Sequence, residues 1–552
     1  MSQVYSPLIE QRRGQMFPVL SADEIARLER FGEAVKFSAG QRIVATGEVS
    51  PGVFVIHAGR IAVSQRNPDG QVQLITTHGP GHFMGELAQL SSRPSLVDAH
   101  AESDVEALVI PSRRLRDVLV ENAELGERIM RALILRRVGL LETHSGGPVI
   151  IGHAGQAKML ALQNFLERNG HPHQQLDPDT DSCARTLVER FHIQPDELPI
   201  VLCPNGQLLR NPTEGTLARC IGLVRAIDPE RLFDVAIVGA GPAGLAAAVY
   251  AGSEGLCTIV LDCRAFGGQA GASQRIENYM GFPTGISGMA LMARAYNQAQ
   301  KFGVEMAIPD EISRLNLAPH GFTLDLANGE ALKTRAVVIA SGARYRRLDI
   351  SNIAEFEGTA IHYWASPLEA RLCAGQEVAL VGAGNSAGQG AVFLASQVKK
   401  VWMIVRGKSL DATMSNYLVE RIKAQPNIEV LTETEIFELN GKDGILDSVR
   451  WRNRKTGAET PKDIRHLFLF IGAEPNTDWL ASCDVMRDAK GFIRTDIGRT
   501  LQPLETSMEG VFAIGDVRAG SVKRVAASVG EGAQVVAALH AYLAQPRAAK
   551  VA

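Results

Sequence analysis

Three glycines near the middle of the chain have the spacing of a dinucleotide-binding turn. In "FDVAIVGAGPAGLAAAVYAGSEGLCTIVLD", a buried-type strand leads into Gly239-x-Gly241-x-x-Gly244, an alanine-rich helix follows, and a second strand ends at an acid. Glycines permit a tight turn and close approach to a pyrophosphate, the helix N-terminus favours negative charge, and the terminal carboxylate suits ribose hydroxyls. The segment therefore predicts a Rossmann-type site. Its expected contacts are Gly239, Gly241, Pro242, Ala243, Gly244 and Asp262.

A second turn of this kind lies in "QEVALVGAGNSAGQGAVFLASQVKKVWMIVRGKSL". No acid closes its second strand, and Arg406 and Lys408 follow the strand instead. Positive charge at this place suits the 2′-phosphate of NADPH, although basic residues also occur on ordinary solvated turns. The position within the motif favours the phosphate site. Its expected contacts are Gly382, Gly384, Asn385, Ser386, Ala387, Arg406 and Lys408.

Two such sites in one chain predict a resident flavin and a diffusing hydride donor. The segments "GGQAGASQRIENYMGFP", "VVIASGARYR", "FLFIGAEPN" and "GVFAIGDVRAG", with both motifs, resemble the thioredoxin reductase family over about residues 233–545. The resemblance implies FAD and NADPH as cofactors. It also implies an NADPH-binding domain at 346–472, inserted into an FAD-binding domain of 233–345 and 473–545. Further flavin contacts implied by it are Gly268, Gln269, Asn278, Ser341, Gly342, Gly515, Asp516, Arg524 and Ala526.

The thiol pair of that family is missing. Thioredoxin reductases carry Cys-x-x-Cys after a tyrosine, just before the nicotinamide-site strand, whereas "HYWASPLEA" places Trp-Ala-Ser-Pro (364–367) after Tyr363. None of these four side chains can form or break a disulfide. Cys373 is near in sequence, but one cysteine cannot cycle alone. We therefore expect an NADPH oxidoreductase whose electrons go to another acceptor, such as ferredoxin, flavodoxin, a quinone or oxygen.

Two other interpretations of the flavoprotein part stay open. The chain could still reduce thioredoxin-type disulfides through cysteines elsewhere. Alternatively, it could be a redox or nucleotide sensor without turnover, in which the flavoprotein part reports the NADPH state to the segments that precede it.

The first segment, 1–144, predicts an antiparallel β-roll, because short β-rich runs alternate with turns between about 30 and 110. In it, "FMGELAQLSSRPSLVDAHA" resembles the phosphate-binding cassette of cyclic nucleotide-binding domains. The resemblance implies that Gly85 opens the helix facing the phosphate and that Glu86 binds the ribose. Ser95 stands where the family has its arginine, with Arg93 nearby, and a serine cannot supply that charge. A ligand-free docking roll and a working nucleotide sensor both fit.

An amphipathic helix is predicted to close this segment. Leu125, Ile129 and Leu133 keep helical spacing among charged residues. Such a helix often dimerises in relatives, so a homodimer is expected. The stretch after it does not have a helix-turn-helix pattern, which argues against DNA binding.

The second segment, 148–228, has the order strand, helix, strand, helix, two strands and helix. This order, with Pro199 before a hairpin strand, resembles thioredoxin and glutaredoxin folds, and Pro199 is expected in the cis form. At the place of their dithiol the chain has His-Ala-Gly-Gln (153–156), so that chemistry is absent. A core role is favoured for Cys183 and Cys203.

The totals agree with a multidomain α/β protein built from these four parts. A chain of 552 residues is too long for one core, and its net charge of −3 indicates neither nucleic-acid nor membrane binding. No signal peptide or membrane span is visible, so the cytoplasm is the expected location. Seven cysteines are scattered and never spaced as Cys-x-x-Cys, so neither a disulfide framework nor a metal site is expected.

Overall fold

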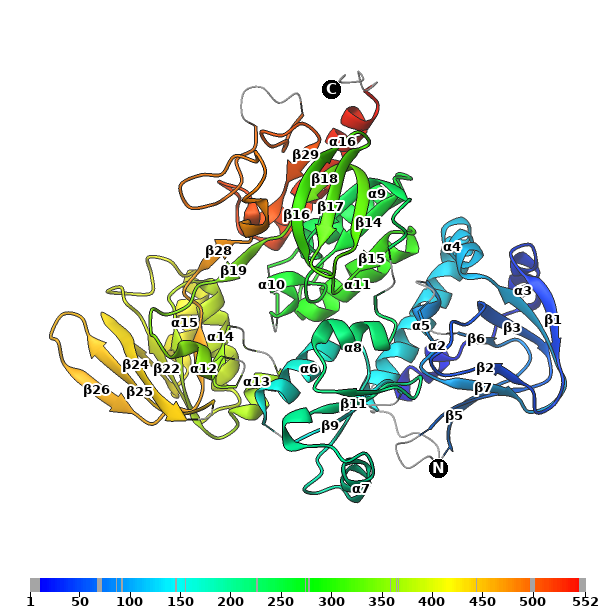
Figure 1. Ribbon diagram of the computed structural model, residues 1–552, viewed down its shortest axis with the longest axis horizontal. Coiled ribbons are helices and arrows are strands. Elements are labelled where there is room, and N and C mark those ends of the chain that lie inside the picture. Colours follow the sequence, from blue (N-terminus) through cyan, green and yellow to red (C-terminus); the bar gives the residue numbers. More distant parts are fainter. Residues whose placement is uncertain are drawn as a thin grey trace. The chain divides into compact units, whose positions relative to one another are not determined.

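The computed structural model describes most of the chain, and the chain divides into two compact units. Unit 1 consists of Met1–Asp228, Cys263–Ala265 and Asn297–Glu311, and unit 2 consists of the remainder. Figure 1 shows the elements in sequence colours. The described residues are 10–66, 72–85, 87–90, 93–143, 146–153, 155–224, 227–273, 275–276, 278–357, 359–363, 365, 367–442, 444–496 and 502–545.

Unit 1 begins with a roll of two four-stranded antiparallel sheets, ordered β1-β8-β3-β6 and β2-β7-β4-β5. Strand β3 shows why the segment forms a roll with helices packed on it. Successive side chains of a strand point to opposite faces. Phe54 and Ile56 pack inside the roll, while Val53 and Val55 pack in a second cluster with the helices. The predicted antiparallel roll is confirmed. Its strands are β1 (Glu33–Phe37), β2 (Arg42–Val44), β3 (Val53–Ala58), β4 (Ile61–Arg66), β5 (Val72–His78), β6 (Phe83–Met84), β7 (Asp98–Ala101) and β8 (Val105–Ile110).

The helices packed on this roll include the predicted amphipathic one. Leu125, Ile129 and Leu133 are at most 2% exposed, as the spacing predicts. They join the cluster that contains the outer face of β3. The helices are α2 (Arg13–Met16), α3 (Ala22–Glu29), α4 (Ser112–Glu121) and α5 (Ala123–Glu142), with the short 3-10 helix η1 (Leu87–Leu90) after β6.

The second part of unit 1 is a four-stranded sheet of order β10-β9-β11-β12 with three helices. Strands β9 and β10 are parallel, and β11 is antiparallel to β9 and β12. The predicted element order is confirmed, as are the cis Leu198–Pro199 bond and the hairpin. The elements are β9 (Val149–Ile151), α6 (Ala157–Arg168), β10 (Gln174–Leu176), α7 (Ser182–Arg190), β11 (Ile200–Leu202), β12 (Leu208–Arg210) and α8 (Glu214–Cys220).

A disulfide in this part corrects the cysteine prediction. Cys203, just after β11, is bonded to Cys220, the last residue of α8. The two sulfurs meet because α8 packs on the same core cluster as the end of β11. The expectation that the scattered cysteines form no disulfide is therefore wrong for this pair, and the simple core role given to Cys203 is incomplete. The core role given to Cys183 is wrong, because its side chain is exposed.

The FAD-type part of unit 2 is built on parallel strands. Strands β14, β13, β18 and β29 lie side by side in this order and are parallel, and the antiparallel strands β17 and β16 follow on β18. The elements are β13 (Leu232–Val238), α9 (Pro242–Ser253), β14 (Thr258–Leu261), α10 (Gly268–Gly271), α11 (Gly288–Lys301), β16 (Ile312–Ala318), β17 (Gly321–Leu326), β18 (Ala331–Ile339), β29 (Val511–Ala513) and α16 (Val525–Leu543). The end of α11 and the strand β15 (Glu305–Ala307) belong to unit 1 in the division given above.

The second Rossmann-type part is a five-stranded parallel sheet of order β20-β27-β21-β22-β23, with a three-stranded antiparallel sheet β24-β25-β26. Strands β19 (Ala343–Tyr345) and β28 (Ala473–Pro475) pair where the predicted insertion begins and ends. The exact domain boundaries stay a prediction. The other elements are α12 (Ile353–Phe356), β20 (Ile361–His362), α13 (Pro367–Leu372), β21 (Glu377–Val381), α14 (Asn385–Ala395), β22 (Lys400–Ile404), α15 (Asn416–Ala424), β23 (Ile428–Leu431), β24 (Thr434–Lys442), β25 (Ile445–Asn453), β26 (Glu459–Lys462) and β27 (Leu467–Leu469).

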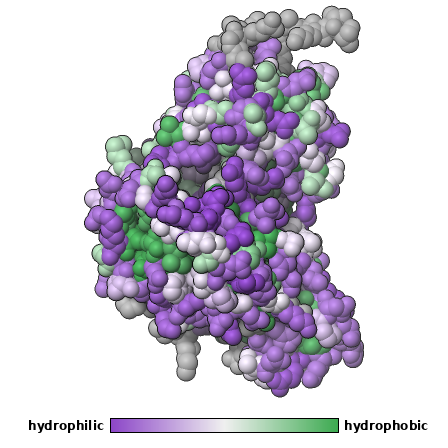
Figure 2. All heavy atoms as spheres, turned by 90° about the vertical axis from the view of Figure 1, so that its left-hand side faces the viewer, coloured by the Kyte–Doolittle hydropathy of each residue, from purple (hydrophilic) through white to green (hydrophobic). Residues whose placement is uncertain are grey.

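The surface is mainly polar on the face that Figure 2 shows, where apolar residues gather in separate areas between hydrophilic ones. Large exposed apolar side chains come from many parts of the chain, Met280 and Leu317 among them. Such scattered residues are normal for a folded protein. Among the described helices, none combines the length and the apolar composition needed to cross a membrane.

Candidate functional site

The first glycine turn is closed by backbone packing that only glycine permits. A Cβ on Gly239 would lie 2.2 Å from the carbonyl oxygen of Ala340, and Gly239 has a φ of 113°. A Cβ on Gly244 would lie 1.8 Å from the carbonyl oxygen of Gly239. Gly241 caps the N-terminus of α9, and Pro242 occupies the first helical position, where its missing N–H is no loss. The motif therefore forms the tight strand–turn–helix that the spacing predicts.

Two further predicted contacts lie at the same helix N-terminus. A Cβ on Gly268 would lie 3.1 Å from the Cα of Gly241, so the start of α10 approaches the turn closely. The carboxylate of Asp262 accepts a hydrogen bond of 2.9 Å from the amide of Ala240. Gln269 donates its side-chain amide to the carbonyl of Ala343. The structure thus brings Gly241, Gly268 and Asp262 together around backbone N–H groups that can bind a pyrophosphate.

Of the C-terminal contacts Gly515 and Asp516, Gly515 packs against the same helix. A Cβ on Gly515, whose φ is 72°, would lie 2.8 Å from the Cβ of Ala243, and its amide donates to Glu531 over 2.6 Å. Asp516 is partly buried. Burial raises the pKa of its carboxyl, although the positive charge of Lys523 lowers that pKa in part. In the part of the chain that the structure describes, this carboxylate accepts no hydrogen bond. A half-buried acceptor without a donor fits a cofactor hydroxyl, so these residues fit FAD.

Some of the other predicted flavin contacts are hydrogen-bonded within the protein, and others are exposed. Ser341 donates its hydroxyl to the carbonyl of Asn476, and the Asn476 side chain donates to the carbonyl of Ser341, both over 2.8 Å. Ser341 and Gly342 therefore bind the two ends of the β19–β28 connection together. Asn278, Arg524 and Ala526 are exposed. Their contact with flavin stays a prediction.

The second glycine turn repeats the construction of the first. A Cβ on Gly382 would lie 2.5 Å from the carbonyl oxygen of Phe470, while Gly384 caps α14 with open space at its Cβ. The side-chain oxygen of Asn385 accepts a hydrogen bond of 2.7 Å from the amide of Ser415. Ala387 is buried, and Ser386 is exposed. The N-terminus of α14 is thus open on the side where a phosphate would approach.

Two cations stand beside this turn. Arg406 and Lys408 follow β22, which runs parallel to β21, and both are exposed. Over the described ranges neither has a carboxylate within ion-pair distance. Guanidinium and ammonium groups that no acid neutralises are available for a phosphate. The geometry fits the 2′-phosphate of NADPH.

The predicted nucleotide cassette of the roll is held by an arginine that sequence analysis missed. Arg136 on α5 is 6% exposed and donates to the carbonyls of Gly85, Phe83 and Met16 at 2.7, 3.1 and 3.0 Å. A signal existed, since Arg136 shares a helical stripe with the apolar Leu133 and Leu140. A charged residue in such a stripe indicates a buried polar contact.

The remaining residues of the predicted cassette offer fewer contacts to a ligand. Ser95 is buried, and its hydroxyl donates to the carbonyl of Val97 at 2.8 Å. The same hydroxyl accepts a hydrogen bond of 3.3 Å from the amide of Val97, so Ser95 is bonded within a local turn. Arg93 is partly exposed, and Glu86 lies outside the described residues.

The segment at the place of the missing thiols contains no reactive sulfur. Tyr363 donates its hydroxyl to Glu357, and burial together with that bond raises the pKa of Tyr363. Pro367 begins α13, and residues 364 and 366 lie outside the described part. Cys373 is fully buried, and burial with the charge of Glu369 raises the pKa of its thiol to about 12. At the second missing dithiol, His153 contacts Asp179 over 2.9 Å.

Comparison with known proteins agrees with this geometry. The family model described as pyridine nucleotide-disulphide oxidoreductase matches residues 233–532, more than half of the chain. The chain belongs to this family. A cyclic nucleotide-binding domain model matches residues 34–122. The chain is therefore an NADPH-dependent flavoprotein oxidoreductase of the thioredoxin reductase type, with FAD and NADPH as cofactors, joined to an N-terminal cyclic nucleotide-binding domain.

Individual relatives cover somewhat more than half of this chain. It is 32% identical over 308 residues to a thioredoxin reductase of Mycoplasmopsis pulmonis, which covers 55% of this chain and 94% of that protein. It is also 32% identical to an NADPH-dependent thioredoxin reductase of Arabidopsis thaliana, over 57% of this chain and 59% of that one. The crystal structure of Lactococcus lactis thioredoxin reductase aligns with a TM-score of 0.52 and 27% identity, over 56% and 99% of the two chains.

Proposed function

We propose that this flavoprotein takes electrons from NADPH and passes them to an acceptor other than thioredoxin. The absence of a thiol pair where the family carries one supports this most directly. Ferredoxin, flavodoxin, a quinone and oxygen are acceptors that need no sulfur relay. In this proposal the N-terminal domain regulates the activity, and the chain acts as a homodimer.

The chemistry of the nearby groups supports a route without sulfur. Disulfide exchange requires a thiolate and a second sulfur. Cys373 is buried, and burial raises the pKa of its thiol, which makes it a poor source of thiolate. Bound FAD supplies a group that accepts hydride and can release single electrons. The residues that would hold it are Gly239, Gly241, Gly244, Gly268 and Asp516.

An acceptor panel tests the proposal. We expect the purified holoprotein to oxidise NADPH with at least one of ferredoxin, flavodoxin, a soluble quinone or oxygen. We expect oxidised thioredoxin to give no rate above the acceptor-free background. NADPH consumption measured at equal acceptor concentrations decides between them, and Cys373→Ala should use the same acceptors as the unmutated chain. Rapid thioredoxin reduction, or no turnover with any acceptor, would contradict the proposal.

The Cys203–Cys220 disulfide favours a second candidate, disulfide reduction through cysteines outside the family's usual position. In that case NADPH would reduce this bond, giving two thiols, one proton taken up and NADP⁺. Cys203 is buried, whereas Cys220 is partly exposed and could meet a substrate sulfur.

A double variant separates the two candidates. If the bond is structural, as our first proposal requires, Cys203→Ser with Cys220→Ser keeps the NADPH oxidation rate within about twofold. The same change lowers the free energy of unfolding of this part by about 3 kcal/mol, because the bond closes a loop with a sequence separation of 17 residues. Turnover and denaturant unfolding measure the two effects. Loss of turnover with little loss of stability would favour the second candidate.

A further inference from the structure

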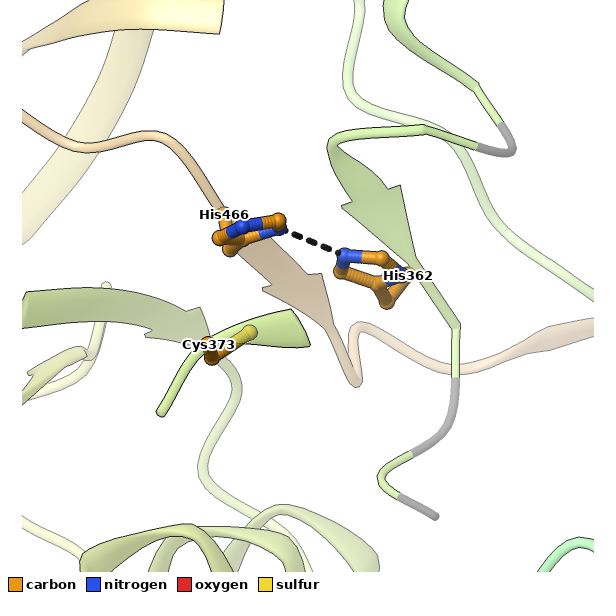
Figure 3. Close-up of side chains that lie close together, drawn as sticks. All are labelled: His362, Cys373 and His466. Atoms are coloured by element: carbon orange, nitrogen blue, oxygen red, sulfur yellow. Dashed lines mark hydrogen bonds between the residues drawn. The ribbon is translucent and has the colours of Figure 1, made fainter. Parts of the chain in front are cut away.

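A buried group of metal-ligating side chains lies beside the segment that lost its thiols. His362, Cys373 and His466 each offer one ligand atom, and these atoms lie within 4.8 Å of one another. Figure 3 shows the two imidazoles facing each other with the sulfur nearby. We propose that these three residues bind a zinc ion.

Three separate elements bring the ligands together. His362 ends β20, Cys373 directly follows α13, and His466 directly precedes β27. Strands β20 and β27 are parallel, with His362 opposite Phe468, and His466 lies two positions before Phe468, so His362 and His466 are on the same face of the sheet. The amide of Cys373 donates to the carbonyl of Glu369 over 3.1 Å, which continues the last turn of α13. The positions are therefore fixed by regular backbone.

The spacing of the two imidazoles suits a tetrahedral ion. Nε2 of His362 lies 3.1 Å from Nδ1 of His466, and the rings stack with centroids 5.3 Å apart. Two nitrogens bound to one tetrahedral zinc at about 2.0–2.1 Å are roughly 3.3 Å apart. The pair therefore needs little movement to bind an ion between its nitrogens. The hydrogen bond that now joins them would be replaced.

The surroundings also suit zinc binding. His362 is 7% exposed and contacts the ring of Phe468, and Cys373 belongs to the same apolar cluster as Phe468. Nε2 of His362 and Nδ1 of His466 share a hydrogen bond, so one of the two nitrogens is an acceptor with a free lone pair. A ring nitrogen in this form can bind metal.

Zinc binding to this donor set would release one proton. Zinc binds the sulfur as thiolate, so Cys373 loses its proton to solvent while one Zn–S and two Zn–N bonds form. Two neutral imidazoles and one thiolate leave one positive charge, and the carboxylate of Glu369, one turn earlier, is close enough to act on Cys373 electrostatically. Three protein ligands leave the fourth position for water or another oxygen. Nitrogen and sulfur donors favour zinc over magnesium or calcium.

The ion would have a structural role in this place. His362 precedes Tyr363, and Cys373 lies ten positions after Tyr363. One ion would therefore join both ends of the stretch in which relatives keep their dithiol. This inference does not depend on the identity of the electron acceptor.

Zinc binding can be tested on the full-length holoprotein. The protein is stripped with a chelator under reducing conditions, given zinc and desalted. We expect about one zinc per chain by mass spectrometry. X-ray absorption at the zinc edge should show one sulfur at about 2.3 Å and nitrogens at about 2.0–2.1 Å. No retained zinc, or a zinc shell without sulfur, would overturn the proposal, and this readout needs no variant.

Matched variants identify the ligands. Cys373→Ala should lose the zinc and its sulfur signal. Cys483→Ala, which removes another partly buried thiol, should keep both. His153→Ala disrupts a second, more exposed group with Asp177 and Asp179 and should also keep them. Zinc that follows His153 or Cys483 rather than Cys373 would overturn the assignment, as would a Cys373→Ala protein that keeps its sulfur signal.

Discussion

Replacing Gly244 by Ala should yield a protein that loses its FAD and unfolds more easily. The added Cβ would lie 1.8 Å from the carbonyl oxygen of Gly239, which is backbone and cannot rotate away. Helix α9 must then move off the turn, and forced overpacking costs roughly 1–3 kcal/mol. The movement also displaces the N–H groups that would face the pyrophosphate. We expect FAD affinity to fall at least about tenfold, measured by the flavin retained after gel filtration.

Gly530→Ala is the matched control for this change. Gly530 lies in α16, and no atom lies within 4 Å of the Cβ that alanine would add. Alanine favours a helix over glycine by up to about 1 kcal/mol, so this variant should be as stable as the unmutated chain or more so. It should keep its FAD. If Gly244→Ala behaves like Gly530→Ala in both measurements, the close packing of α9 is not what holds the turn.

Local patterns were sufficient wherever neighbouring residues determine the structure. The glycine turns could be predicted because strand, turn and helix follow each other within one short stretch. Helix α5 could be predicted from the stripe of Leu125, Ile129 and Leu133, which is buried as expected. The absence of the thiol pair could be predicted from the residues after Tyr363 alone. In each case the residues that carry the pattern lie close together in sequence.

Contacts between distant residues could not be predicted in this way. Cys203 pairs with Cys220 only because α8 packs over the end of β11, and their spacing matches no known motif. His362 and His466 are 104 positions apart and meet through the pairing of β20 with β27. Arg136 reaches the cassette carbonyls through the packing of α5 on the roll. Such contacts require the tertiary arrangement.

Removing both cations beside the second turn should change the choice of nicotinamide cofactor. Arg406 and Lys408 are exposed and have no carboxylate partner in the described part of the chain. Contacts of charged groups with phosphate contribute about 1.5–3 kcal/mol each, and solvent exposure reduces this. Arg406→Ala with Lys408→Ala should therefore lower kcat/KM for NADPH roughly 100-fold, mainly through KM. The value for NADH, which has no 2′-phosphate, should change less than about threefold.

Salt dependence and a control variant make this test specific. In the unmutated chain, KM for NADPH should rise with ionic strength, because salt screens exposed charges, and in the double variant the dependence should be weaker. Lys423→Ala removes an exposed cation of the same domain that is already paired with Glu420 over 3.0 Å. It should leave both cofactors unaffected. Equal losses with NADH and NADPH in the double variant would show that these cations support the fold of the turn and do not bind the 2′-phosphate.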